Sequence, residues 1–149
     1  MNVIQLDLKR GEFGFEVRDE GGHVLQTDTS LENGGLNFGF RPMQLVLGAL
    51  GSCSAIDVAS ILKKQRQQVD SFSITIKGTR EENKIPSLWK EVQVHFALTG
   101  KIDPAKAQRA ISLSMDKHCS VAETLRRGGT RITWTVDIKE THHHRGVAL

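Results

Sequence analysis

The residues best suited to chemistry in this chain are its two cysteines, Cys53 and Cys119. Two cysteines are too few for a disulfide scaffold in 149 residues or for a four-thiolate zinc site. They lie 66 positions apart, so the C-x-x-C spacing of many redox motifs does not apply. A disulfide would require Cα atoms within about 7 Å, and closing that loop would stabilise the oxidised form by roughly 4 kcal/mol. We therefore expect a thiol pair or a single reactive centre.

Cys53 lies in a run of small residues, 51–55, in the middle of a predicted helix. It could simply fill a buried position as a small hydrophobe. Alternatively, its small neighbours let another backbone or a substrate come close. Asp57 follows one turn later on the same face, and a carboxylate beside a thiol raises the pKa of that thiol. Asp57 therefore either caps a structural feature or holds an arginine that serves the thiolate.

Cys119 immediately precedes a predicted helix start, at which Ser120 and Glu123 have the spacing of a capping box. The free N–H groups and the positive dipole end of that helix would favour a thiolate at Cys119. The alternative is a boundary residue that only packs.

Hydrophobic periodicity predicts the elements that must position these thiols. Pro42 opens the central helix, and Asp103 with Pro104 starts a later one. The expected elements are strands at 4–8, 13–17 and 23–27, a helix at 42–67, strands at 72–76 and 92–98, helices at 104–115 and 120–127, and a strand at 132–138. This order favours an α+β fold with antiparallel pairing over a doubly wound sheet.

The helix predicted over 42–67 is apolar on nearly all sides, as expected for a helix through the middle of a protein. Asp57 and several serines and glycines make it a poor membrane span, and the N-terminus has no targeting signal, so we expect a cytoplasmic protein. The formal charge of +3 and the absence of tyrosine argue against nucleic-acid binding. No cluster of metal ligands or nucleotide-binding motif stands out.

Length and composition predict a single domain over residues 1–140. Residues 141–149 form an expected disordered tail. Its run of three histidines (142–144) is either part of a purification tag or a native terminus.

Four segments of the chain form a distinctive set: Arg41–Met43, Cys53–Val58, Ile61–Lys64 and Cys119–Ala122. Together they resemble the OsmC/Ohr superfamily of osmotically inducible and organic-hydroperoxide-resistance proteins. The resemblance implies an OsmC-like fold, in which antiparallel sheets wrap around two long central helices in an intertwined homodimer. It also implies thiol-dependent reduction of hydroperoxides, with Cys53 as the peroxidatic nucleophile and Cys119 as the resolving thiol. A dithiol reductant would restore the pair, with no metal, haem or flavin.

Two departures separate the chain from the peroxidases of this superfamily. Met43 stands where those members carry a glutamate that pairs with an arginine beside the thiolate, and Ser120 replaces a proline of many relatives. The candidates for the arginine are Arg10, Arg18 and Arg41. Arg41 precedes Cys53 by twelve residues, about 18 Å along one straight helix, so it could serve only a partner subunit's thiol or none.

The leading hypothesis is an enzyme, a cysteine-based hydroperoxide reductase that acts in oxidative stress defence. A second is a redox-responsive or apolar-ligand-binding protein without efficient turnover. A third is that both cysteines are structural.

Overall fold

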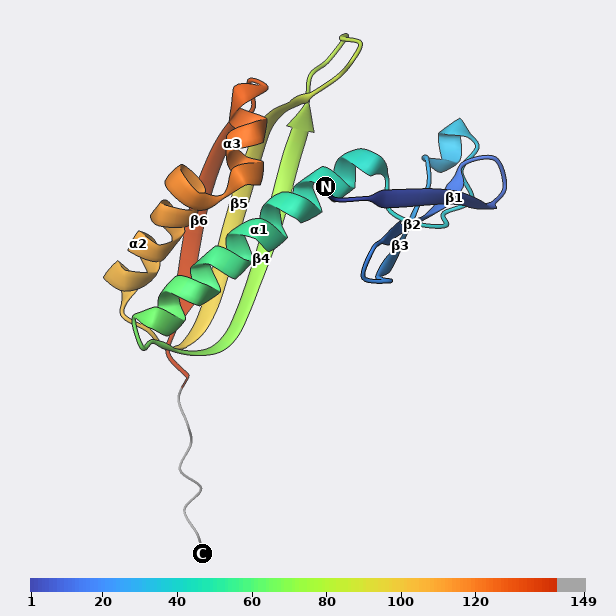
Figure 1. Ribbon diagram of the computed structural model, residues 1–149. Helices are drawn as coiled ribbons and strands as arrows, with labels where there is room; N and C mark the ends of the chain where they lie inside the picture. The colour runs from blue at the N-terminus through green and yellow to red at the C-terminus, as the bar shows by residue number, and fades with distance from the viewer. Residues whose placement is uncertain (142–149) are drawn as a thin grey trace, which may run out of the picture. The chain divides into compact units, whose positions relative to one another are not determined.

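The computed structural model describes residues 1–141, which form two compact units with the boundary after Gly48. The elements are β1 (Ile4–Arg10), β2 (Gly14–Asp19), β3 (Val24–Thr27), the short 3₁₀ helix η1 (Leu31–Asn33), α1 (Pro42–Lys64), β4 (Gln68–Arg80), β5 (Trp89–Lys101), α2 (Pro104–Leu113), the π-helical turn η2 (Ser114–His118), α3 (Ser120–Arg127) and β6 (Arg131–Lys139) (Figure 1). This is a mixed α+β fold with two small sheets and three α-helices, in the order that the sequence predicts. The single domain expected over 1–140 stays a prediction, and the expected tail lies, apart from Thr141, outside the described residues.

The first unit is an antiparallel sheet of β1, β2 and β3. The alternating apolar residues of β1 lie on one face of it, as the pattern predicts. On that face Ile4, Leu6 and Leu8 are 56%, 55% and 53% exposed. Exposed apolar surface of this kind is typical of sites at which proteins contact one another.

Asp28 closes the loop between β3 and α1. Its carboxylate accepts backbone N–H bonds from Thr29 at 2.7 Å, Leu36 at 2.9 Å and Phe38 at 3.0 Å, and the residue is only 3% exposed. The backbone bond from Phe38, followed by those from Leu36 and Thr29 and the charge of Arg10, outweighs the effect of burial and lowers the pKa of Asp28. The charged form of Asp28 therefore holds the loop in place.

Acidification should lower the free energy of unfolding, because Asp28 becomes protonated. Because its pKa in the folded state lies below its ordinary value of about 3.9, its stabilisation is complete above that value and is lost as the pH falls through the lower, folded-state pKa. In denaturant titrations from about pH 6 to about pH 2, we expect Asp28→Asn to be less stable than the wild type at the upper end. The difference should shrink on acidification. Glu12→Gln, on the surface of the same unit, is the control, and a constant difference at every pH would contradict this role.

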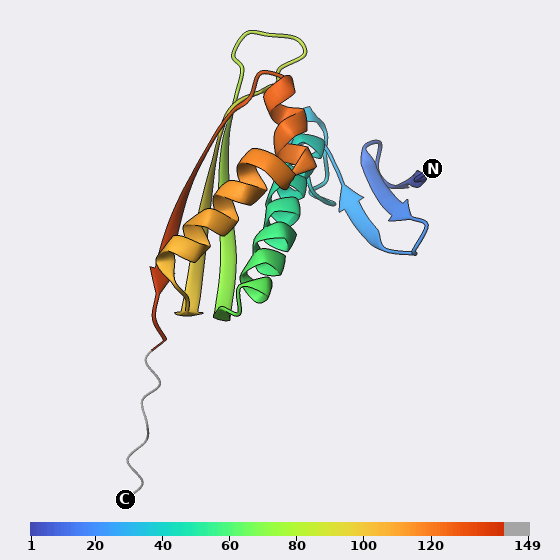
Figure 2. The same cartoon turned by 60° about the vertical axis from the view of Figure 1, so that its left-hand side comes forward.

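The second unit is a three-stranded sheet with β5 at its centre and α1, α2 and α3 over one face (Figures 1 and 2). The inward-pointing residues of β5 are each no more than 1% exposed: Val92, Val94, Phe96 and Leu98. Buried helix residues cover them, among them Leu50, Val58 and Leu62 of α1 and Ala107, Ala110 and Ile111 of α2. This is the core against which both cysteine-bearing segments pack.

The prediction of antiparallel pairing throughout is wrong for one pair of strands. β4 and β5 are antiparallel, but β5 and β6 are parallel, from Glu91 opposite Arg131 to Thr99 opposite Lys139. The helices between them return the chain along the sheet, so β6 starts at the same end as β5. Parallel neighbours need such a crossover.

Helix α1 is apolar on nearly all sides, but in the described single chain only one side of it is buried. Its predicted place in the middle of the protein stays a prediction. Only Leu50, Ser54, Val58 and Leu62 are buried, a stripe with one residue per turn, whereas Ile56 is 70% exposed. One 18-residue window of α1 has a mean hydropathy of 1.9, and only 22% of that window is buried. By length and composition alone such a helix could cross a membrane, a test that core helices of soluble proteins also pass.

Candidate active site

Helix α1 carries Cys53 on the edge of its buried stripe. Cys53 is half-buried, and the next residue, Ser54, is fully buried. Gly51, two residues before Cys53, faces β4, where a Cβ atom would come within 2.8 Å of Ile76 Cδ1. The absence of a side chain at Gly51 therefore leaves room for the side chain of Ile76. Close approach of a substrate or of another backbone to the small-residue run stays a prediction.

The π-helical turn η2 positions Cys119. α2 starts as predicted, with Asp103 Oδ1 accepting the backbone N–H of Ala105 at 2.8 Å, and it then widens into η2. The Cys119 N–H donates to the carbonyl of Ser114, five residues earlier, at 2.8 Å. Arg126 of α3 donates to the carbonyl of Met115 inside this turn. The widened turn leaves Cys119 in an extended conformation and only 3% exposed.

The predicted capping box at Ser120 is wrong, because Cys119 itself caps α3. Its Sγ accepts the backbone N–H of Ala122 at 3.4 Å, and its φ of −71° and ψ of 103° are typical of a cap residue. Ser120 is the first residue of the helix, and Glu123 pairs with Arg127 at 2.8 Å.

The fold brings Cys119 close to the part of α1 that carries Cys53, because Ser54, the next residue, donates to Cys119 Sγ at 3.6 Å. The two thiols are near enough for Cys53 to act on the pKa of Cys119. Both cysteines are free. Burial raises the pKa of Cys119 above its ordinary value, and the hydrogen bond and charge of Cys53 raise it further. The Ala122 N–H and the Ser54 hydroxyl act in the opposite direction but are outweighed. The helix end thus favours the thiolate through the Ala122 N–H, as one of the two alternatives expects, but burial has the larger effect on the pKa of Cys119.

Asp57 makes a structural contact, as one of the two hypotheses from the sequence expects. The Ser114 hydroxyl, fully buried at the start of η2, donates to Asp57 Oδ2 at 3.0 Å. This bond ties α1 to the turn that holds Cys119, and it satisfies a buried polar group.

Ser54 is the residue of this site that sequence reasoning missed. Its Oγ lies 3.2 Å from Met115 Sδ and 3.6 Å from Cys119 Sγ, with the hydroxyl as donor. The signal in the sequence was a serine directly after a cysteine, on the side of the helix occupied by Leu50 and Val58. A polar residue in an otherwise apolar stripe needs a partner.

The predicted arginines all belong to the first unit, whereas Cys53 belongs to the second. Arg18 pairs with Glu16 at 2.5 Å, the charge of Arg10 acts on Asp28, and the backbone N–H of Arg41 donates to the side chain of Gln44. Over the described range, 1–141, no group of three His, Cys, Asp or Glu residues could hold a metal ion.

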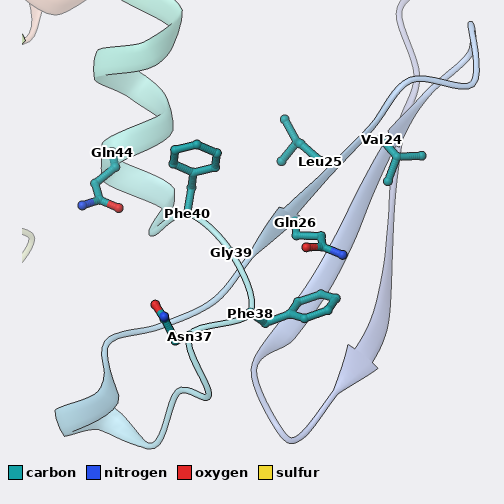
Figure 3. Close-up of a pocket in the computed structure, with 8 residues that line it drawn as sticks. All are labelled: Val24, Leu25, Gln26, Asn37, Phe38, Gly39, Phe40 and Gln44. Carbon is teal, nitrogen blue, oxygen red and sulfur yellow. The ribbon is translucent and has the colours of Figure 1, made fainter. Parts of the chain in front are cut away.

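The first unit also carries a shallow groove of about 530 Å³ along β3 (Figure 3). Residues 24–26, 37–40 and Gln44 line it, with the rings of Phe38 and Phe40 as its largest apolar surfaces. Its polar side chains are amides, from Gln26, Asn37 and Gln44. Such a lining can bind an apolar ligand, but none of its side chains is a nucleophile.

The model of the OsmC-like protein family matches residues 33–135 of this chain, a stretch that contains both cysteines. The chain belongs to this family. Protein YhfA of Escherichia coli (strain K12) is 44% identical over 87 residues, which are 58% of this chain and 64% of that protein. The match thus spans less than two thirds of that relative's length.

Solved structures share the OsmC-like fold over nearly the whole chain. A hypothetical protein from Aquifex aeolicus VF5 is 32% identical, with a TM-score of 0.76 over 93% of this chain and 97% of its own. An organic hydroperoxide resistance protein OsmC from Legionella pneumophila is 16% identical, with a TM-score of 0.70 over 92% and 96%. At that identity the second likeness shows the fold alone.

Proposed function

We propose that this OsmC-like protein is a cytoplasmic, thiol-dependent reductase of organic hydroperoxides that acts in oxidative stress defence. The observation that carries the proposal is the proximity of Cys53 and Cys119, two thiols that lie far apart in the sequence. Cys119 Sγ lies 3.6 Å from Oγ of Ser54, the neighbour of Cys53, and Cys53 raises the pKa of Cys119. Family membership supports it, since proteins of the same fold include an organic hydroperoxide resistance protein from Elizabethkingia anophelis. Cys53 is the more exposed thiol and the proposed nucleophile.

In the proposed reaction the Cys53 thiolate attacks one oxygen of the hydroperoxide. The O–O bond breaks, an alcohol leaves with a proton, and Cys53 becomes a sulfenic acid. The Cys119 thiolate then attacks the Cys53 sulfur, the S–O bond breaks, and the hydroxyl group leaves as water after taking up a proton. A dithiol reductant supplies two electrons and two protons to return the disulfide to two thiols.

A second copy of the chain is the proposed partner. The uncovered apolar surfaces of α1, around Ile56, and of β1, at Ile4, Leu6 and Leu8, are typical of protein–protein interfaces. Each chain contributes one 23-residue helix, so the two long central helices of the expected fold would be one α1 from each copy.

The second candidate function is a redox-responsive or apolar-ligand-binding protein without efficient turnover. The groove lined by Phe38 and Phe40 favours it, as does Met43 at the position where the resemblance expects a glutamate. In that case the thiol pair would oxidise once and not cycle.

The deciding experiment mixes the full chain with cumene hydroperoxide and dithiothreitol and follows peroxide loss. Many turnovers per chain, faster than with hydrogen peroxide, are expected of the reductase. One oxidation per chain without cycling would favour the second candidate. Thiols that react no faster than free cysteine would show that both cysteines are structural.

A further inference from the structure

Ser54 presents one hydroxyl proton to two sulfur atoms. Its Oγ lies 3.2 Å from the thioether of Met115 and 3.6 Å from the thiol of Cys119, and all three residues are buried. A hydroxyl has one proton to donate, and thioethers and neutral thiols are both weak acceptors. A thiolate is a much stronger acceptor, because hydrogen bonds to charged groups are roughly twice as strong. The preferred acceptor of Ser54 therefore changes when Cys119 ionises.

Cys119 needs such a donor more than Cys53 does. It must become a thiolate to attack a sulfenic acid, yet burial opposes its ionisation. The Ala122 N–H is a donor fixed by the helix, at 3.4 Å from Sγ. The Ser54 hydroxyl is the second donor, and it is free to rotate.

Other titratable and charged groups lie on the segments packed against Cys119. From α1 they are Cys53 and Asp57; from η2, Asp116, Lys117 and His118; and from α3, Glu123, Arg126 and Arg127. The three carboxylates have partners: Asp57 accepts from Ser114, Asp116 pairs with Arg126 at 3.6 Å, and Glu123 pairs with Arg127. His118 is exposed, whereas Ser54 is fully buried.

We propose that Ser54 is a positioning residue for the second thiol: its hydroxyl donates to Met115 while Cys119 is neutral and turns to Cys119 Sγ as the thiolate forms. The inference rests on the proposed function and adds how the resolving thiol of that reaction is activated. Met115 acts as the resting acceptor that competes for the same proton.

Two variants should shift the pH dependence of Cys119 ionisation in opposite directions. Ser54→Ala removes the donor, so thiolate formation at Cys119 should shift to higher pH and disulfide formation at neutral pH should slow roughly tenfold or more. Met115→Leu keeps the side-chain volume but removes the competing acceptor, so the same profile should shift to lower pH. Ser54→Thr, which keeps the hydroxyl, should restore the wild-type profile.

The experiment measures only the second step of the reaction, in which Cys119 attacks the oxidised Cys53 and the disulfide forms. Protein is first oxidised with one equivalent of cumene hydroperoxide at low pH, then brought to each pH, and disulfide formation is followed by quenching and mass spectrometry. Profiles that move in the same direction for Ser54→Ala and Met115→Leu, or do not move, would overturn the proposal, because a simple packing defect gives no opposite signs.

A peroxide-free measurement keeps this test separate from that of the proposed function. In a Cys53→Ser background, the ultraviolet absorbance of the Cys119 thiolate is titrated in three proteins: one with no further change, one with Ser54→Ala and one with Met115→Leu. Opposite shifts of the titration support the role of Ser54 even if Cys53 fails to reduce any peroxide. Coincident titrations would refute it even if the peroxidase is active.

Discussion

Cys53→Ser should lower kcat/KM for cumene hydroperoxide by at least about a thousandfold, because a serine hydroxyl does not ionise near neutral pH and is a far weaker nucleophile than a thiolate. Cys119→Ser should behave differently. It leaves Cys53 able to attack the peroxide once, so a first turnover should remain while disulfide formation is lost. Rapid mixing with the peroxide, with and without dithiothreitol, separates the first turnover from cycling.

Trapping the sulfenic acid with dimedone provides the control for the two roles. The adduct should form on Cys53, and it should accumulate in Cys119→Ser because no thiol resolves the sulfenic acid. An adduct on Cys119 in the wild type would show that Cys119, not Cys53, attacks the peroxide. Equal activity of the wild type and Cys53→Ser would show that Cys53 is not the nucleophile. The burial of Cys119 and the greater exposure of Cys53 are the reasons for this assignment.

The elements around the site could be predicted from the sequence because each has a local signal. Pro42 opens α1, Asp103 caps α2, and the alternating residues of β5 form the buried face of the sheet. These signals lie within a few residues of the features that they specify. They predict the order of strands and helices.

The remaining features depend on contacts between distant segments or, for the cap of α3, on the widened turn directly before it. The parallel pairing of β6 depends on the path of the crossover helices, and the cap of α3 depends on a π-helical turn that moves Cys119 into the cap position. The raised pKa of Cys119 is due first to burial, which a local reading of the helix end does not include. Ser54 has its two sulfur neighbours only because Met115 and Cys119 approach it from a distant part of the sequence.

The exposed side of α1 has a property that a lone chain does not explain. The helix is strongly apolar, yet its buried stripe covers only one side, and Ile56 on another side is 70% exposed. An apolar helix in water is stable when a second surface covers it, and a second copy offers the same surface. Ile56 already contacts little within its own chain, so a change there tests the partner surface without altering the core.

Ile56→Asp should therefore separate the proposed dimer while each chain stays folded. An unpaired carboxylate buried in the contact, contributed by both copies, should weaken association by at least about a hundredfold. Sedimentation equilibrium measures the mass, and far-ultraviolet circular dichroism reports whether the chain is folded. Ser73→Asp, on the exposed polar side of β4, introduces the same charge as a control and should remain dimeric. A wild-type chain that sediments as a monomer, or an Ile56→Asp variant that stays dimeric, would place the partner surface elsewhere.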